Sequence, residues 1–523
     1  MMAPGGSALP ALSVWFPVGR GRRTRRDHAS IRIVTRYALA LLVALGFTAR
    51  AAAEPKPWRA GNLQTVEVWT QATQKQQAGN TNVWIARGLH ADRSARTVEF
   101  VVEATGLTTD ALTEFLVVST SSEKDYESLA VSLAHAGDIC RGLEFVGMPR
   151  GRPVKPAICQ FWPKGERVRA TFRPFGRSAK DARPLSACLQ DKRPRTLLPE
   201  NFVYVGSCWT GAVCLADEAS PGAFISTYNE PTVVLDVPSR APQSDVYGNL
   251  VLSPAGTFER GALLTITLTP EPLSNGVPRV VDLTFEARRR ADGAGGNGLE
   301  ALECITRGTE PALGPVTNDV KGALERLAEL SRNGRDPFMT VSWDDAISLG
   351  AARELARVFT MVEGESGVRV EAPLAGQLYY KAFLPGERWR ARADRPSQPW
   401  ELRVTRSKEK KGGWSCTLVQ ILEDWSKEGQ FTPDLTPTDF QLARPEDLPG
   451  KIRELVAAQV LEVTQKLARE GKPTDDSRVG QLATLKRINT LFIFAPPDAP
   501  LGSFMPAVRL MHDTLPQVHV FVE

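Results

Sequence analysis

T-V-E-F-V-V, at Thr97–Val102, carries the pattern that decides the fold of the N-terminal half. Its β-branched and aromatic residues alternate with polar ones, which is typical of a strand with one buried face. Similar short runs recur from Leu63 to about Thr284, separated by Gly, Pro and Asn. They are Thr65–Trp69, Glu114–Ser119, Val168–Phe172, Phe202–Val205 and Leu264–Leu268. We therefore predict a largely β, sandwich-like domain over residues 54–286, interrupted by a helix that Asp138 caps.

A helical period replaces this pattern in the second half. Val320, Leu324, Leu327 and Leu330 share one helical face, and Gly334 follows where a C-terminal cap belongs. Ser342 with Asp345 resembles a capping box for the next helix. Strand-like alternation returns between 377 and 421, and an amphipathic stripe then runs from 452 to 467. The fold class is therefore α+β, with a mixed α/β C-terminal region.

The chain closes with a strand, a helix and a second strand. The strands are Leu491–Phe494 and Val518–Val522, and the predicted helix runs from Ser503 to about His512. This spacing suits a parallel βαβ crossover. We predict a small α/β module over 436–523, preceded by a mixed helix and strand region over 299–435.

Ala287–Gly298 reads A-R-R-R-A-D-G-A-G-G-N-G, a charged and glycine-rich break. Such composition is typical of a flexible connection, so we predict that 287–298 links two halves of the chain. No internal repeat is visible across it.

The N-terminus has the layout of a secretory signal peptide. Arginines precede an apolar run of 13 residues at Tyr37–Ala49, and Ala51–Ala53 supply small residues for a cut after Ala53. A spanning helix needs about 20 apolar residues. Residues 1–53 carry eight arginines and one aspartate, a net +7, so the +5 of the whole chain becomes −2 after cleavage. This removes most of the case for binding nucleic acid. We expect a periplasmic or secreted protein with no stable membrane span.

All seven cysteines lie after the predicted cut, so some can pair in an oxidising compartment. Cys208 and Cys214 are the closest two in sequence and form a candidate disulfide, with small buried hydrophobes as the alternative. No C-x-x-C occurs, and no metal or cofactor is predicted. A redox or metal-binding module built on four thiols remains a competing hypothesis. The four are Cys159, Cys188, Cys208 and Cys214.

Two loops are candidate sites. Lys124, Asp125, Tyr126 and Glu127 lie between two strand-like runs and form a candidate ligand loop. We favour the alternative of a turn whose Tyr126 packs inward and whose charges are solvated. G-S-C-W-T-G at 206–211 suggests a nucleophile turn, but it lacks the G-x-S-x-G pattern, and a glycine-bracketed β-turn explains it more simply.

Six segments between about 98 and 269 resemble the YdjY-domain family of exported bacterial proteins. They are E-F-L-V-V-S-T (114–120), K-D-Y-E-S-L-A-V (124–131), G-D-I-C-R-G-L-E-F-V-G-M (137–148), N-F-V-Y-V-G-S (201–207), A-F-I-S-T-Y-N-E-P (223–231) and D-V-Y-G-N (245–249). The resemblance implies export and a β-rich domain, and it carries no activity over to particular residues.

The C-terminal part, from about Thr436, is similar to the periplasmic domain of ExbD-type biopolymer transport proteins. The supporting segments are the predicted helix at 446–470, L-F-I-F at 491–494, A-P-L-G at 499–502 and the closing V-H-V-F-V. The resemblance implies a module that docks other envelope proteins. The proton-coupled role of that family needs an acidic membrane-spanning helix, which Tyr37–Ala49 does not supply.

Taken together, the patterns favour a non-catalytic binding or scaffolding protein of the bacterial envelope. Its expected partners are envelope proteins or glycans, and not nucleic acid.

Overall fold

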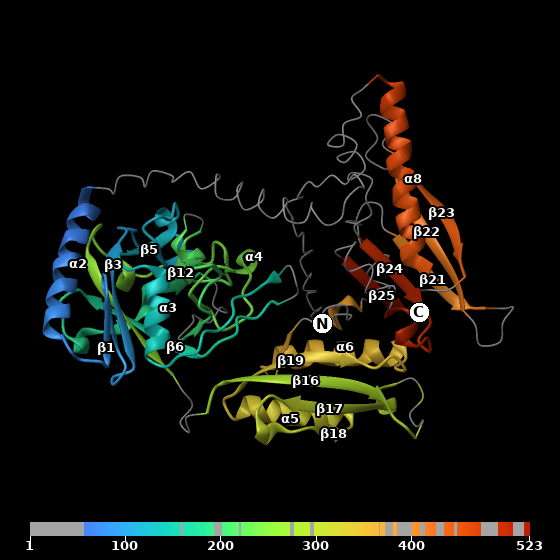
Figure 1. Cartoon of the computed structure of the whole chain (residues 1–523), viewed down its shortest axis with the longest axis horizontal. Coiled ribbons are helices and arrows are strands. Elements are labelled where there is room, and N and C mark those ends of the chain that lie inside the picture. Colours follow the sequence, from blue (N-terminus) through green and yellow to red (C-terminus); the bar gives the residue numbers. More distant parts are fainter. Residues whose placement is uncertain are drawn as a thin grey trace, which may run out of the picture. The chain divides into compact units, whose positions relative to one another are not determined.

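The computed structural model describes residues 57–156, 160–192, 201–218, 221–271, 277–292, 296, 298–365, 367–371, 380–383, 400–407, 414–424, 434–443, 447–471, 490–505 and 517–523. Figure 1 shows a β-rich domain in blue and green, followed by mixed sheets with helices in yellow, orange and red. The predicted α+β class is confirmed. The predicted signal peptide and its cut after Ala53 lie outside the described residues. No helix in the described ranges is both long enough and apolar enough to cross a membrane.

The described part begins with helix α2 (Pro57–Gln76). The predicted strand Thr65–Trp69 is therefore wrong. Leu63, Val66 and Trp69 recur at helical spacing and pack with Val101 and Leu133. Five alternating residues, which fill less than two helical turns, imitated the pattern of a strand. Packing of the helical face determined the structure instead.

Eleven described strands of the β-rich domain form one mixed sheet, and eight of them close into a ring because β3 pairs with both β15 and β5. The ring runs β3 (Thr97–Ala104), β15 (Leu263–Pro270), β6 (Arg167–Pro174), β9 (Phe202–Tyr204), β13 (Leu235–Asp236), β12 (Ala223–Ser226), β4 (Phe115–Val118) and β5 (Ser128–Ser132). The other strands are β1 (Val83–Ala86), β2 (Leu89–Asp92) and β7 (Arg183–Pro184). Apolar side chains of these strands form one core that also includes Ile139 and Leu143.

Short ribbons and helices complete this domain. The ribbons are β10 (Trp209–Thr210) with β11 (Val213–Cys214), and β8 (Leu189–Asp191) with β14 (Leu250–Leu252). The helices are α3 (Ala136–Phe145) and α4 (Gln243–Val246). Helix α3 begins before Asp138, which therefore is not its cap. Asp217 instead accepts hydrogen bonds from the N–H groups of Ala136 (2.7 Å) and Gly137 (3.0 Å).

The next sheet has the order β18-β17-β16-β19-β20. Its strands are β16 (Val280–Arg289), β17 (Leu302–Gly308), β18 (Val316–Asn318), β19 (Asp336–Trp343) and β20 (Arg369–Glu371). Helix α5 (Val320–Arg332) precedes β19 and matches the predicted face, with Asp319 as its N-cap. Helix α6 (Leu349–Glu365) precedes β20. Ser342 lies in β19, so the predicted capping box is wrong, and Ser348 Oγ accepts from the Ala351 N–H at 3.2 Å.

The last sheet has the order β23-β22-β21-β24-β25. Its strands are β21 (Trp400–Arg406), β22 (Trp414–Asp424), β23 (Asp434–Leu442), β24 (Thr490–Ala495) and β25 (Gln517–Val522). Helix α8 (Leu448–Arg469) precedes β24. The predicted parallel pairing of the two closing strands is confirmed, because β24 pairs parallel with β25. The predicted helix between them lies largely outside the described residues.

These two sheets share one topology. In each, three antiparallel strands are followed by a helix and then by two parallel strands that extend the sheet from the first strand. We call 280–371 the first module and 400–522 the second module. The sequence showed no repeat, because the repetition lies in strand order and direction.

Equivalent loops of the two modules pair with each other, just after the fourth strand of each sheet. The Leu349 N–H donates to the Ala499 carbonyl (2.9 Å), and the Leu501 N–H donates to the Ile347 carbonyl (2.8 Å). The Gly350 N–H donates to Pro497 and the Gly502 N–H to Asp345 in the same reciprocal way. Both leucines are buried in one core that contains residues of both sheets. Such reciprocity is the signature of a two-fold interface, here within one chain.

The predicted linker 287–298 is not a link between halves. Ala287, Arg288 and Arg289 are the end of β16 and pair with Cys304, Glu303 and Leu302 of β17. Gly296 and Gly298 lie between these two paired strands, and glycine serves hairpin connections and linkers alike. The boundary predicted at 435/436 likewise falls inside β23, whose sheet already begins at Trp400.

A cluster of paired charges connects β6 to β19, and we call it the Asp336 junction. Arg167 and Arg369 each place a guanidinium nitrogen 3.0 Å from a carboxylate oxygen of Asp336. Asp336 is 9% exposed and Arg369 7%. Burial is the largest influence on Arg167 and lowers its pKa. A buried carboxylate with two arginine partners stabilises the contact between these two strands only while all three groups are present.

Candidate functional site

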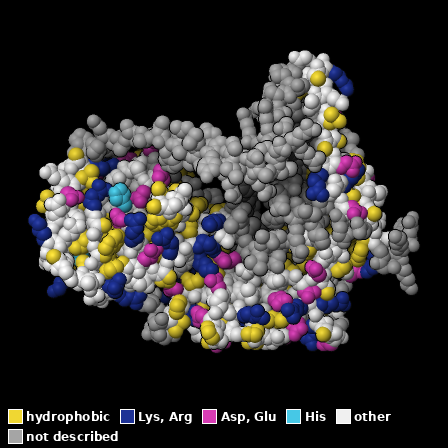
Figure 2. Space-filling model, in the orientation of Figure 1, with side chains coloured by type: hydrophobic (Ala, Val, Ile, Leu, Met, Phe, Trp, Pro, Cys, Tyr) yellow, Lys and Arg dark blue, Asp and Glu magenta, His cyan; other side chains and the backbone are white. Residues whose placement is uncertain are grey.

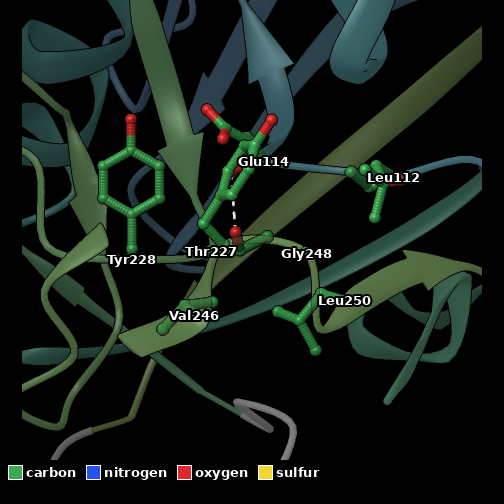
Figure 3. Close-up of a pocket in the computed structure, with 9 residues that line it drawn as sticks. Leu112, Glu114, Thr227, Tyr228, Val246, Gly248 and Leu250 are labelled. Atoms are coloured by element: carbon green, nitrogen blue, oxygen red, sulfur yellow. Dashed lines mark hydrogen bonds between the residues drawn. The ribbon is translucent and has the colours of Figure 1, made fainter. Parts of the chain in front are cut away.

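A small recess opens where three chain segments of the β-rich domain meet (Figure 3). Its lining comes from Leu112–Glu114, Thr227–Tyr228 and Val246–Leu250. The volume is about 10 Å³, which is enough for one ordered water. The recess is therefore too small to enclose more than one small group of a ligand. We call this site the Glu114 recess.

Glu114 is the acidic group of the recess, and its position is set by backbone pairing. Its N–H donates to the Glu127 carbonyl (2.9 Å), and its carbonyl accepts from the Thr227 N–H (3.1 Å) and hydroxyl (2.7 Å). The side chain accepts from the Gln243 amide at 3.2 Å and is 5% exposed. Burial raises the pKa of Glu114, and the neighbouring Glu127 adds to the rise against opposing effects of Gln243 and Lys124.

The predicted ligand loop Lys124–Glu127 adjoins this recess. Asp125–Glu127 form a single 3-10 turn, and Lys124 Nζ donates to Glu127 Oε1 (2.6 Å) and to the Tyr126 hydroxyl (3.1 Å). These hydrogen bonds, with that to Glu127 the stronger, raise the pKa of Lys124. Tyr126 is 63% exposed, so the favoured expectation that it packs inward is wrong. The Lys124 ammonium lies 5.4 Å from the centroid of its ring, and the side chain faces solvent.

Buried carboxyl groups continue beside the recess. Burial raises the pKa of Glu230 and, more strongly, that of the fully buried Asp236. Asp236 Oδ1 accepts from the Asn229 amide (3.0 Å), while Oδ2 has no hydrogen-bond partner within the described ranges. Tyr228 lies among these acids, and its pKa is raised chiefly by burial. Glu114 and Asp236 take their side-chain hydrogen bonds from amides, and Lys124 is a nearby cation whose charge opposes the rise in the pKa of Glu114.

Exposed apolar side chains surround the recess. Tyr126 and Tyr247 are 63% and 60% exposed, and Leu112 is 40% exposed. Tyrosine supplies a large rigid contact surface with a polar tip, which suits recognition. Elsewhere on the face shown in Figure 2, basic and acidic side chains are interspersed in the coloured regions. The recess combines exposed rings with buried acids, which is an arrangement for binding.

The cysteines do not meet as the sequence suggested. Strand pairing places Cys214 opposite Trp209 and leaves Cys208 opposite Leu215, so the two side chains leave opposite faces of the β10–β11 ribbon. Both thiols are free, and the predicted Cys208–Cys214 disulfide is wrong. Cys214 instead has Cys140 of α3 as a neighbour, and the Cys140 thiol donates to the Gly206 carbonyl at 3.7 Å.

The four-thiol hypothesis finds no metal site. Cys188 is buried at the end of the 3-10 turn Leu185–Cys188, beside Gly256. Cys159 lies outside the described residues. Among the described residues, no group of three or more His, Cys, Asp or Glu side chains could hold a metal ion.

Ser207 is not an exposed nucleophile. It is 5% exposed, and its hydroxyl donates to the Thr232 carbonyl. It adopts a φ of 60°, next to Gly206 at 75°. A non-glycine residue in this left-handed region is strained. In this conformation the Ser207 side chain is buried.

Sequence reasoning did not identify the recess, because the predicted loop Lys124–Glu127 adjoins it and supplies none of its lining. Glu114, Tyr228 and Gly248 lie in three of the segments that resemble the YdjY family, and Lys124–Glu127 lie in a fourth. Those segments were quoted separately, and nothing in any one of them showed that they converge. The available signal was that several of the six segments place polar residues just before or after a strand, where binding residues are common.

Comparison of the sequence with models of known protein families gives no match, and comparison with curated proteins gives none. The resemblances to the YdjY and ExbD families therefore rest on the quoted segments alone.

Proposed function

We propose that this chain is an exported protein of the bacterial envelope that binds a partner without catalysis, as a member of the YdjY-domain family. The Glu114 recess is the observation that carries the proposal. Exposed tyrosines surround buried acids there, and the small volume admits only one group of a ligand. The predicted signal peptide supplies the location, which is the periplasm or the exterior.

The chemistry of the recess favours a partner that presents a positive charge. Glu114 and Glu230 have carboxyl groups that are largely withdrawn from water, and they are near Tyr228. A lysine or arginine side chain of the partner would restore the charged form of these acids and gain a charge-assisted hydrogen bond. Tyr126 and Tyr247 would then hold the flanking residues or stack on the cation. We therefore propose an envelope protein with an exposed basic segment, and not a glycan.

The two modules fit the scaffolding part of this role. The second module carries the segments that resemble the ExbD periplasmic domain, and the first module repeats its topology. We propose that the paired modules dock further envelope proteins, while the β-rich domain selects the partner.

Affinity capture tests the proposal. The purified chain, immobilised and exposed to a solubilised envelope fraction, should enrich a protein that high salt releases. A Tyr126→Ala/Tyr247→Ala variant should lose most of that enrichment, because both side chains are exposed and their removal should leave folding intact. A matched variant, Val68→Ala/Val213→Ala, removes exposed apolar side chains elsewhere in the β-rich domain and should retain it.

Three results would count against the proposal. Equal capture by both variants would remove the recess from binding. Enrichment on a peptidoglycan or polysaccharide resin that the tyrosine variant loses would replace the protein partner with a glycan. Turnover of a substrate in a hydrolase or oxidoreductase panel, with no partner enriched, would favour an enzyme.

A further inference from the structure

We propose that Cys140 and Cys214 form a redox-active dithiol, which a small-molecule disulfide converts to an intramolecular disulfide bond. The proposal is independent of partner binding at the Glu114 recess. It rests on the packing of helix α3 against the β10–β11 ribbon and on the turn that precedes this ribbon.

The two thiols face each other across this packing. A Cβ placed on Gly137 would lie 3.5 Å from the Cys214 Cβ, and Cys140 follows Gly137 by about one helical turn on the same face. The Cys140 thiol donates to the Gly206 carbonyl at 3.7 Å, and each of the two cysteines is among the groups that shift the pKa of the other, so they are neighbours. A disulfide needs two Cα atoms within about 7 Å, which calls for elements in direct contact, as α3 and β11 are.

The strained turn at Gly206–Ser207 touches both partners. The Cys140 thiol donates to the Gly206 carbonyl, and Ser207 is among the groups that lower the pKa of Cys214. Ser207 holds a left-handed conformation that disfavours a side chain. Strained backbone that contacts a reactive pair is a common feature of functional sites.

The surroundings divide the roles of the two thiols. The neighbouring Cys140 is the largest influence on Cys214 and, with Ser207 and the Ala216 N–H, lowers its pKa to about 7. Burial raises the pKa of Cys140. Cys214 is therefore the attacking thiolate and Cys140 the resolving thiol. The small disulfide reaches Cys214 through the β10–β11 ribbon, where Val213 is 48% exposed and Cys214 is 3% exposed. The ribbon has two residue pairs, and their opening uncovers the Cys214 thiolate.

The proposed reaction is thiol–disulfide exchange with a small disulfide, RSSR. The Cys214 thiolate attacks one sulfur, forms a mixed disulfide and releases RS⁻. The Cys140 thiol then loses its proton and attacks the Cys214 sulfur, which releases the second RS⁻. The two cysteines lose two electrons to RSSR, and the products are one protein disulfide and two RSH.

Peptide mapping of the full chain tests this step. The purified protein is held either in dithiothreitol or in oxidised glutathione, alkylated under denaturing conditions, and digested with trypsin and chymotrypsin. Cleavage after Trp209 is essential, because it separates Cys208 from Cys214. We expect a peptide from Asp125–Arg141 linked to the peptide that contains Cys214, present after glutathione and lost after dithiothreitol. Alkylation at both thiols should fall together.

Variants assign the roles. Cys208→Ser should retain the link, and Cys140→Ser should leave glutathione on Cys214. The proposal is overturned if Cys140 and Cys214 remain alkylatable while the half-exposed Cys208 carries glutathione, which proves that the reagent arrived. It is also overturned if Cys214 links to Cys208, or if Cys214 keeps glutathione in the wild-type chain. Mapping of the wild-type chain decides alone if a variant does not fold.

Discussion

The Asp336 junction and the Glu114 recess both bury carboxyl groups, but they surround them differently. At the junction, Asp336 has two arginine partners at 3.0 Å. At the recess, Glu114 accepts from the Gln243 amide, and nearby Asp236 accepts from the Asn229 amide. At the junction, the charge pairs hold strands of the fold together. At the recess, Glu114 has an amide as its hydrogen-bond partner, so it can still accept a hydrogen bond from a ligand. Burial of a charge alone therefore does not mark a site.

The largest expected effect is at the junction. Asp336→Ala should lower the free energy of unfolding by about 3–5 kcal/mol, because it leaves Arg167 and Arg369 buried without their counter-charge. Urea unfolding followed by circular dichroism measures the change. Glu259→Ala, at an exposed position of the β-rich domain, is a control for loss of an acid. A loss below about 1 kcal/mol, typical of surface pairs, would mean that solvent reaches the junction.

The paired modules should show nearly equal effects on their two sides. Leu349→Ala and Leu501→Ala each remove a side chain that is 1% exposed, so each should cost about 2–5 kcal/mol. Leu461→Ala, at a leucine that is 58% exposed, is the control. Unfolding of the two variants should be compared at one temperature. A large effect of one leucine beside a negligible effect of the other would contradict the reciprocal pairing.

Removal of a charge beside the recess should raise the free energy of unfolding, whereas removal of one at the junction should lower it. Asp236→Asn keeps the acceptor for Asn229 and the Val237 N–H, and it removes a carboxyl whose pKa is raised by burial. Protons bind this group more tightly in the folded state. The wild-type chain therefore loses stability as the pH rises above the ordinary value of 3.8. The variant should be at least as stable as the wild type at pH 7, and its advantage should vanish near pH 3.

A loss of stability in Asp236→Asn at pH 7 would show that the carboxylate has a cationic partner. The contrast between recess and junction would then fail.

The smallest effect concerns the start of α3. The hydrogen bond to Asp217 raises the pKa of His135, so its contribution is complete below the ordinary value of 6.5 and is lost as the pH rises through the raised value. His135→Ala should cost about 0.2–1 kcal/mol at pH 6, as other exposed pairs do, and less at pH 9. Thermal unfolding at both pH values measures the difference. A cost that does not change with pH would assign His135 a packing role only.

Asp217 provides the matching test at acid pH. Burial opposes ionisation of its carboxyl, yet hydrogen bonds from His135, Gly137 and Ala136 prevail and lower its pKa. Its contribution is therefore present above 3.8 and is lost as the pH falls through the lowered value.

Local patterns predicted elements well where a long period was present. The face of α5, the existence of the helix α8 and the closing parallel strands followed from spacing alone. Thr65–Trp69 failed because five alternating residues fit both a strand and a helical face. Ala287–Gly298 failed because glycines and charges serve hairpin turns and linkers equally well.

The repeated modules and the recess could not be predicted from the sequence. Both depend on contacts between residues far apart in the chain, such as Leu349 with Ala499 and Glu114 with Thr227 and Gln243. The dipeptide L-G occurs at equivalent positions of the two modules, 349–350 and 501–502. Two matching residues are too few to reveal a duplication. Cys140 and Cys214 likewise meet only through the docking of α3 on a ribbon.

Hydrogen–deuterium exchange of the chain with its captured partner tests whether binding occurs at the Glu114 recess. We expect the partner to slow exchange of the amides at 112–114, 124–127, 227–230 and 243–250, which line or adjoin the recess. Tyr126→Ala/Tyr247→Ala should abolish this protection at the same partner concentration. Protection confined to the two modules, with these four segments unchanged in the wild-type chain, would contradict the assignment of binding to the recess.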